Sequence, residues 1–190
     1  MSEAATAPYD WYGLNTEIFL AINQYHAPAF DRLMLALDVL AHPRLFPVYI
    51  AAMLWMAWRA PGTTPMRNVV CFATGYLLVS MTAVPVLKYW LDQPRPLTAL
   101  GAERVTVLGT PDALHSFPSG HAAFAVLLAA SLIPGSARSV QIAMIAFALL
   151  VCFSRISTGA HFPLDVLAGA GLAFVIVTVL RRLLPAGGKR

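Results

Sequence analysis

The sequence predicts an all-α integral membrane protein, a helical bundle with five transmembrane helices preceded by amphipathic N-terminal helices. Of its 190 residues, 58% are hydrophobic and only 12% are charged, and the mean hydropathy of +0.68 is one that a soluble domain of this size rarely shows. Five apolar stretches are close to the ~20 residues that a helix needs to cross the hydrocarbon. They are 42–58, 69–90, 117–133, 139–153 and 164–184. We therefore expect one domain over residues 1–190, with its membrane core at 42–184.

The segment 14–41 has a helical pattern but is too often interrupted by charge for a lipid-exposed span. The interrupting residues are Glu17, Asp31, Arg32 and Asp38. We expect two amphipathic helices, broken near residues 26–28, that make residues 1–41 an N-terminal region at the outer membrane interface. A membrane-inserted hairpin or a sixth span is the alternative.

The distribution of charge predicts the orientation of the bundle. One set of span ends carries seven cations and no acid, namely Arg59, Arg67, Arg138, Arg181, Arg182, Lys189 and Arg190. The other side holds the remaining six cations and all nine acids. The positive-inside rule places the basic ends, with the tail at 185–190, in the cytoplasm. Because the net charge of +4 follows the membrane ends in this way, it gives no indication of nucleic acid binding.

Polar residues that are unusual in membrane helices gather at the outward ends of the predicted spans. They are Lys88, Arg95, Ser119, His121, Arg155, His161 and Asp165. Three segments supply them. The first, 88–96, closes a span with Lys88 and adds Arg95 after a turn stiffened by Pro94. Taken alone, it is better explained by cations that reach from a span to the membrane interface.

The second segment, 117–121, reads Phe-Pro-Ser-Gly-His and runs into an apolar stretch, which predicts the start of a helix. Ser119 is in position to cap it. The unpaired N–H groups of a helix N-terminus bind phosphate oxygens readily, and Gly120 lets the backbone approach the anion closely. An ordinary capped membrane helix is the alternative, but it does not explain why the titratable His121 begins a helix embedded in lipid.

The third segment, 154–165, joins the last two predicted spans. Pro163 suits the first turn of the final helix, so His161 precedes the helix and Asp165 lies in its first turn. The carboxylate can then reach a ring nitrogen of His161, fix the tautomer and leave the other nitrogen available for attack. The alternative is an aspartate that stabilises a helix N-terminus beside an unrelated histidine.

Together these segments provide what phosphoryl transfer requires. Lys88, Arg95 and Arg155 can stabilise the charge on the transferring phosphoryl group without a metal. His161 can attack phosphorus to give a phosphohistidine. His121 can protonate the leaving oxygen and afterwards activate water. We expect neither a cofactor nor a bound metal.

Each segment also resembles a signature of a known family, the type 2 phosphatidic acid phosphatases (PAP2). Residues 88–96 match K-x6-R-P, 118–121 match P-S-G-H, and 154–165 match S-R-x5-H-x3-D. The resemblance extends over roughly residues 40–184 and implies a core of six membrane helices, one more than we count. It also implies that His161 is the nucleophile, that Asp165 orients it, and that His121 is the acid and base. The implied phosphate ligands are Lys88, Arg95, Ser119, Gly120 and Arg155.

The short N-terminal arm and compact loop are similar to those of bacterial undecaprenyl-diphosphate phosphatases, so undecaprenyl diphosphate is the expected substrate. Members of the family also act on phosphatidic acid, phosphatidylglycerophosphate, lipid A phosphates and sugar phosphates. The choice among them depends on the lipid groove and on the 97–117 loop, whose specificity the sequence pattern does not predict. The expected setting is a bacterial inner membrane, with the bilayer and a lipid phosphate as partners and the site facing outward.

Three other activities fit parts of the pattern. Cations within the membrane can line the pathway of a transporter for an anion or a phosphorylated solute, although such a pathway needs no histidine supported by an aspartate. A phosphotransferase would pass the phosphoryl group from His161 to another lipid or sugar. Two histidines and an aspartate could also bind zinc, but the surrounding cations would repel it. His115 precedes the second segment, where a solvated loop histidine is the simpler interpretation.

Overall fold

The computed structural model describes residues 9–62, 64–109 and 114–184, and its regular elements there are all helical. The prediction of an all-α fold is therefore confirmed. The α-helices are α1 (Leu14–Asn23), α2 (Pro28–Leu40), α3 (Phe46–Arg59), α4 (Met66–Leu78), α5 (Val84–Leu91), α6 (Pro96–Leu100), α7 (Gly120–Leu132), α8 (Arg138–Ser157) and α9 (Pro163–Leu183). Short 3-10 turns at Trp11–Gly13 and Pro43–Leu45 lead into α1 and α3.

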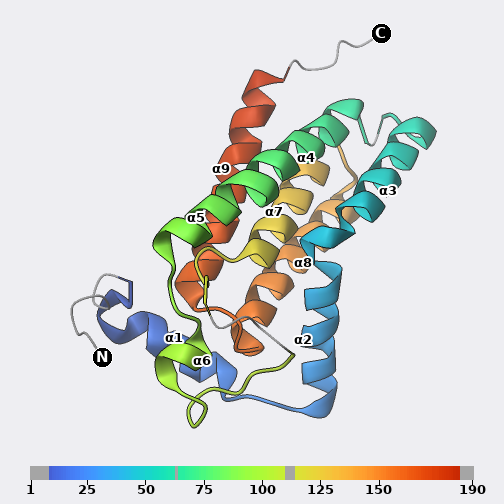
Figure 1. Ribbon diagram of the computed structural model, residues 1–190. Helices are drawn as coiled ribbons and strands as arrows, with labels where there is room; N and C mark the ends of the chain where they lie inside the picture. Colours follow the sequence, from blue (N-terminus) through green and yellow to red (C-terminus); the bar gives the residue numbers. More distant parts are fainter. Residues whose placement is uncertain (1–8, 63, 110–113, 185–190) are drawn as a thin grey trace.

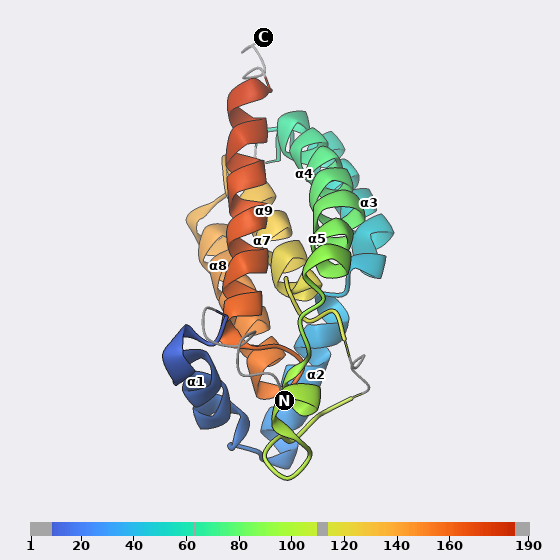
Figure 2. The ribbon, with the colours of Figure 1, turned by 60° about the vertical axis from the view of Figure 1, so that its left-hand side comes forward.

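Helix α7 lies at the centre of the bundle, in contact with α4, α8 and α9 (Figure 1, Figure 2). Buried residues occur on every side of it, from Ala122 to Ser131. A helix that is apolar all round is expected in a core, and α7 provides the core of this bundle. Its N-cap residue Ser119 is fully buried, so the helix begins inside the protein.

Three helical stretches of the described chain are long and apolar enough to cross a membrane. They are Met66–Leu100, Arg138–Ser157 and Pro163–Leu183. A fourth candidate is a pair of helices, Pro28–Leu40 and Pro43–Arg59, that would form one span with a bend of 52°. The shorter helix α7 is also apolar. The membrane character of the fold agrees with the sequence analysis, whereas the number of spans stays a prediction.

The first of these stretches contains a local change of helix type. A π-helical turn at Val79–Ala83 joins α4 to α5 and ends two residues before Pro85. Proline has no N–H for the regular helical ladder, and a π-turn is one way in which a helix accommodates the irregularity. The continued helix carries Lys88 to the rim of the site described below.

The N-terminal region forms two helices separated at residues 24–27, close to the predicted break. Helix α1 lies across one end of the bundle, and α2 runs beside α8 (Figure 1, Figure 2). The buried side chain of Asn23 fastens α1 in place. It donates to the carbonyl oxygens of Ser157 (2.9 Å) and Thr106 (2.8 Å) and accepts from the Thr106 amide (2.9 Å). The N-terminal arm is thus attached to the end of α8 and to the loop after α6.

The basic helix ends lie together at the opposite end of the bundle, near the C-terminus of α9 and the turn between α3 and α4 (Figure 1). There the side chain of Arg67 donates to the carbonyl of Arg181, whose guanidinium donates to Asn68 Oδ1 at 3.0 Å. The predicted tail at 185–190, with Lys189 and Arg190, lies outside the described residues, as do residues 110–113 of the 97–117 loop.

Candidate active site

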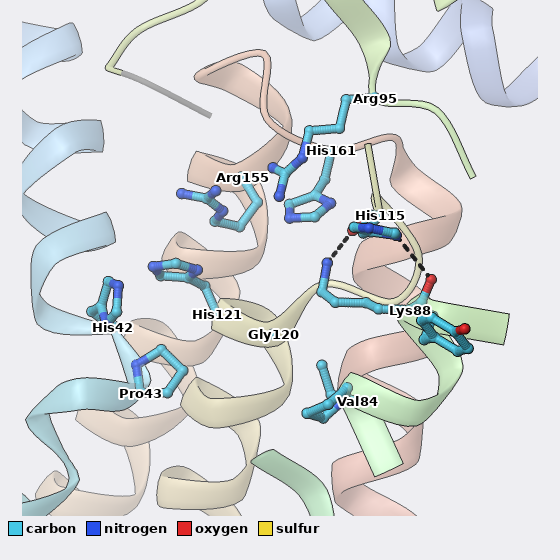
Figure 3. Close-up of a pocket in the computed structure, with 12 residues that line it drawn as sticks. His42, Pro43, Val84, Lys88, Arg95, His115, Gly120, His121, Arg155 and His161 are labelled. Atoms are coloured by element: carbon cyan, nitrogen blue, oxygen red, sulfur yellow. Dashed lines mark hydrogen bonds between the residues drawn. The ribbon is translucent and has the colours of Figure 1, made fainter. Parts of the chain in front are cut away.

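A cavity of about 460 Å³ opens where the end of α5, the start of α7 and the connection from α8 to α9 meet (Figure 3). Six of the eight residues singled out from the sequence line it: Lys88, Arg95, Gly120, His121, Arg155 and His161. The other two, Ser119 and Asp165, are fully buried behind its wall. The fold therefore brings the three segments together at one place.

The buried His161 is held by the carboxylate of Asp165. Its Nδ1 lies 3.3 Å from Asp165 Oδ2, the contact expected from their spacing in the sequence. The same oxygen accepts from the Phe162 amide at 2.9 Å and from Ser116 Oγ at 2.5 Å. Because Asp165 engages Nδ1, the proton of the neutral ring belongs on Nδ1, and Nε2 carries the lone pair.

Burial determines the charge state of His161. Removal from water disfavours the imidazolium and lowers its pKa from 6.5 to about 3, although Asp165 acts in the opposite direction. Arg155 and Arg95 add to the lowering by repulsion. The ring is therefore neutral at physiological pH, which is the state that a nucleophilic nitrogen requires.

Residues of the N-terminal arm that no sequence motif marks complete the support of Asp165. The hydroxyl of Tyr9 donates to Asp165 Oδ1. Asn15 accepts from the Leu164 amide at 3.0 Å and donates to the Tyr9 carbonyl at 3.2 Å. Burial and the neighbouring Asp165 carboxylate raise the pKa of Tyr9, so its hydroxyl stays protonated and available as a donor. No local pattern reveals contacts between residues so far apart in the chain.

The start of α7 is fixed against α9 by the backbone. The Ser119 amide donates to the Asp165 carbonyl at 2.9 Å. The close approach depends on Gly169, because a Cβ at that position would come within 2.3 Å of the Ser119 carbonyl oxygen. The second and third segments are thereby held in register.

Ser119 occupies the N-cap position as predicted, but its side chain does not cap the helix. The buried Oγ has no hydrogen-bond partner among the described residues. This corrects the expectation of a side-chain cap and has a consequence for the chemistry. A buried hydroxyl without a partner is costly, and an oxygen of a bound phosphate would provide one.

The two buried arginines are positioned by different groups. Arg95 donates from Nη1 to the Ala160 carbonyl (3.1 Å) and from Nε to the Leu114 carbonyl (3.2 Å). Arg155 forms an ion pair with Asp38 of α2, which also accepts from Ser154 Oγ at 3.1 Å. Asp38 was considered in the sequence only as an interruption of an apolar stretch. The Nε of Arg155 is buried without a partner among the described residues, so it too can bind an anion.

Two further histidines line the cavity. His115 Nδ1 lies 2.8 Å from a carboxylate oxygen of Asp92, and its carbonyl accepts from Lys88 Nζ (Figure 3). The ring of His42 meets that of His121 edge to face, with centroids 5.0 Å apart. His42 follows α2 and was not expected at the site.

The described lining of this cavity carries three cations and no carboxylate. Such a lining attracts an anion, and the uncharged Nε2 of His161 gives it a nucleophile. Among the described residues, no group of three or more His, Cys, Asp or Glu side chains is arranged to hold a metal ion. The arrangement suits transfer of a phosphoryl group to a histidine.

Comparisons with known proteins identify the family. A family model of the PAP2 superfamily matches residues 68–188. An undecaprenyl-diphosphatase of Sulfolobus acidocaldarius is 29% identical over 158 residues, which are 83% of this chain and 72% of that protein. The undecaprenyl-diphosphatase BcrC of Bacillus subtilis is 30% identical over 167 residues, 86% of this chain and 80% of that protein.

Solved structures show the same fold. The crystal structure of Aquifex aeolicus LpxE superposes with a TM-score of 0.76 at 27% identity, over 89% of this chain and 95% of that one. A PAP2-type phosphatidylglycerolphosphate phosphatase of Bacillus subtilis superposes with a TM-score of 0.71 at 24% identity, over 95% of this chain and 89% of that one. The resemblance noted in the sequence is confirmed: the chain belongs to the PAP2 superfamily and is an integral membrane phosphatase.

Proposed function

We propose that this membrane lipid phosphatase removes the terminal phosphate of a polyprenyl diphosphate through a phosphohistidine at His161. The leading candidate substrate is undecaprenyl diphosphate. The observation that carries the proposal is the buried His161, which is held by Asp165 in the wall of a cavity lined by three cations. The two relatives named undecaprenyl-diphosphatase, which align with most of this chain, support the choice of substrate.

In the first step, Nε2 of His161 attacks the terminal phosphorus. An N–P bond forms while the P–O bond to the lipid breaks, and the electron pair of that bond stays with the leaving oxygen. His121 donates a proton to this oxygen, which belongs to the second phosphate, and the lipid monophosphate is released. Lys88, Arg95 and Arg155 stabilise the charge on the non-bridging oxygens.

In the second step, water displaces the histidine. His121, now without its proton, accepts one from the water as the oxygen attacks phosphorus. The N–P bond breaks, inorganic phosphate leaves, and His161 regains its lone pair. Throughout, Asp165 holds Nδ1 and stabilises the positive charge that the ring acquires while it carries the phosphoryl group.

We further propose that the cavity faces the outside of the cell membrane. The basic helix ends lie at the opposite end of the bundle, where the positive-inside rule expects the cytoplasm (Figure 1). Val84, Pro85 and Tyr89 of α5 add an apolar portion to the wall of the cavity. In a bacterium this arrangement would place the reaction at the outer surface of the inner membrane.

Phosphate release from a panel of substrates tests the proposal. The panel contains a prenyl diphosphate, the matching monophosphate, phosphatidic acid, phosphatidylglycerophosphate and lipid A, each offered to purified protein in detergent. We expect the fastest release from the diphosphate and almost none after His161→Ala. The matched control is His26→Ala, because His26 lies between α1 and α2 and pairs with Asp31.

Several outcomes would contradict the proposal. Equal rates for wild type and His161→Ala would show that His161 is not the nucleophile. Faster release from phosphatidic acid, phosphatidylglycerophosphate or lipid A than from the prenyl diphosphate would show that the proposed substrate is wrong. Appearance of the phosphoryl group on a second lipid or sugar instead of in solution would identify a phosphotransferase, and uptake into vesicles without hydrolysis would identify a transporter.

A further inference from the structure

A second cavity, of about 440 Å³, adjoins the first. Four residues line both cavities: His42, Arg95, His121 and Arg155. His161 lines only the first cavity, and Arg44 lines only the second. The space beside the nucleophile therefore continues past His121 toward the short turn between α2 and α3.

Three histidines follow one another along this path. Figure 3 shows His161, His121 and His42 in succession, with Arg155 above the middle of the row. His121 and His42 are in direct contact, their ring centroids 5.0 Å apart and their planes at 87°. His121 thus has the proposed nucleophile on one side and His42 on the other.

The order of the three histidines indicates where the leaving group lies in the proposed reaction. The leaving oxygen departs from phosphorus on the side opposite the attacking nitrogen. The acid His121 must contact that oxygen, so whatever the oxygen is attached to lies beyond His121 as seen from His161. In a lipid diphosphate that group is the second phosphate, whereas in a monophosphate it is an uncharged carbon chain.

The groups beyond His121 are suited to a phosphate. Nδ1 of His42 accepts a hydrogen bond from the Arg44 amide at 3.1 Å, so the proton of the neutral ring is on Nε2, where it can be donated to an anion. Arg44 adds a guanidinium, a strong ligand of phosphate oxygens. The acidic residue in the described lining is Asp38, whose charge is compensated by its ion pair with Arg155.

We propose that His42 and Arg44 form a second phosphate subsite, which binds the lipid-proximal phosphate of a diphosphate substrate and makes the enzyme selective for lipid diphosphates over monophosphates. The proposal rests on the phosphatase reaction proposed above. Neither residue lies within the 68–188 stretch that the family model matches, so the subsite belongs to the N-terminal part of this chain.

The test compares farnesyl diphosphate with farnesyl monophosphate, which share one tail and differ by one phosphate. For Arg44→Gln we expect kcat/KM for the diphosphate to fall about tenfold or more, the effect of one lost charge-assisted contact, while the value for the monophosphate stays within about twofold. His42→Gln should change the ratio in the same direction. Arg32→Gln is the matched control, because Arg32 is an exposed arginine of α2 that bonds to the carbonyl of its own helix at Pro28.

A binding measurement supplements the kinetics and does not depend on turnover. Methylene diphosphonate should inhibit Arg44→Gln about tenfold less strongly than wild type, whereas vanadate, which mimics one phosphate, should inhibit both alike. Equal losses on both farnesyl substrates, or unchanged selectivity, would overturn the subsite while the phosphatase reaction stands. Absence of phosphate release by wild type from either substrate would instead overturn the proposed function, and the subsite with it.

Discussion

The hydroxyl of Tyr9 donates a hydrogen bond to the carboxylate of Asp165, the residue that holds the proposed nucleophile. The two carboxylate oxygens of Asp165 contact different groups. Oδ1 receives Tyr9, and Oδ2 receives His161, Ser116 and the Phe162 amide. The N-terminal arm is thus part of the active site, although it lies far from the three sequence motifs.

Replacing Tyr9 by phenylalanine should therefore slow the chemical step. A hydrogen bond to a charged group contributes about 1.5–3 kcal/mol, so we expect kcat to fall about tenfold, with little change in KM because Tyr9 is not in the cavity lining. Steady-state rates on farnesyl diphosphate measure the effect. Tyr12→Phe is the control, since that side chain is 97% exposed. Equal kcat values for the two variants would show that the Tyr9 contact does not influence His161.

The glycine at position 169 should be essential for the register of α7 and α9. In Gly169→Ala the new methyl group would collide with the Ser119 carbonyl, and overpacking of this kind costs about 1–3 kcal/mol. We expect a lower melting temperature and an activity loss of tenfold or more, because Ser119 moves away from Asp165. Gly171→Ala, two residues along the same helix with nothing within 4 Å of the new Cβ, should behave as wild type. Similar effects of the two substitutions would refute the packing argument.

The hydroxyl of Ser119 should act on the bound anion and not on the fold. Since Oγ bonds to no described residue, Ser119→Ala removes no hydrogen bond seen in the structure and should leave the melting temperature unchanged. It should weaken inhibition by vanadate about tenfold, the effect of one lost bond to a charged ligand. Ser131→Ala serves as control, because Ser131 is buried at the other end of α7. Unaltered vanadate inhibition would show that Ser119 does not bind the phosphate.

The lowered pKa of His161 predicts a pH dependence of stability. Between pH 6.5 and about 3 the unfolded chain binds a proton at this residue and the folded chain does not, so the free energy of unfolding falls as the pH is lowered. At pH 5 the loss from this group is about 2 kcal/mol. His161→Asn, which cannot take up the proton, should lose less stability than wild type between pH 7 and 5. Parallel melting temperatures over that interval would contradict a neutral, buried His161.

Local patterns in the sequence were sufficient to predict several features of the site. Hydropathy located the apolar helices, and proline and glycine marked where α7 and α9 begin. The contact between His161 and Asp165 could be predicted because the two residues are four positions apart, one just before α9 and the other in its first turn. These features depend on neighbouring residues, which a single sequence displays directly.

The remaining features depend on contacts between distant parts of the chain. Asp38 was interpreted as an interruption of an apolar stretch, whereas it pairs with Arg155 across the interface of α2 and α8. His42 had no partner in the sequence and contacts His121 in the fold. The expected cap by Ser119 is absent, since tertiary packing against Asp165 and Gly169 directs that residue. Hydropathy alone does not predict which face of an amphipathic helix will carry such contacts.

The most direct test of the central claim is to trap the phosphoenzyme during a single turnover. Enzyme in excess is mixed with farnesyl diphosphate radiolabelled in its terminal phosphate and quenched in base, where a phosphohistidine survives, and the labelled peptide is identified by mass spectrometry. We expect label on the peptide containing His161, which appears before free phosphate and decays as phosphate is released, and none in His161→Asn. Release of phosphate by His161→Asn at the wild-type rate, or label on another residue, would contradict the account.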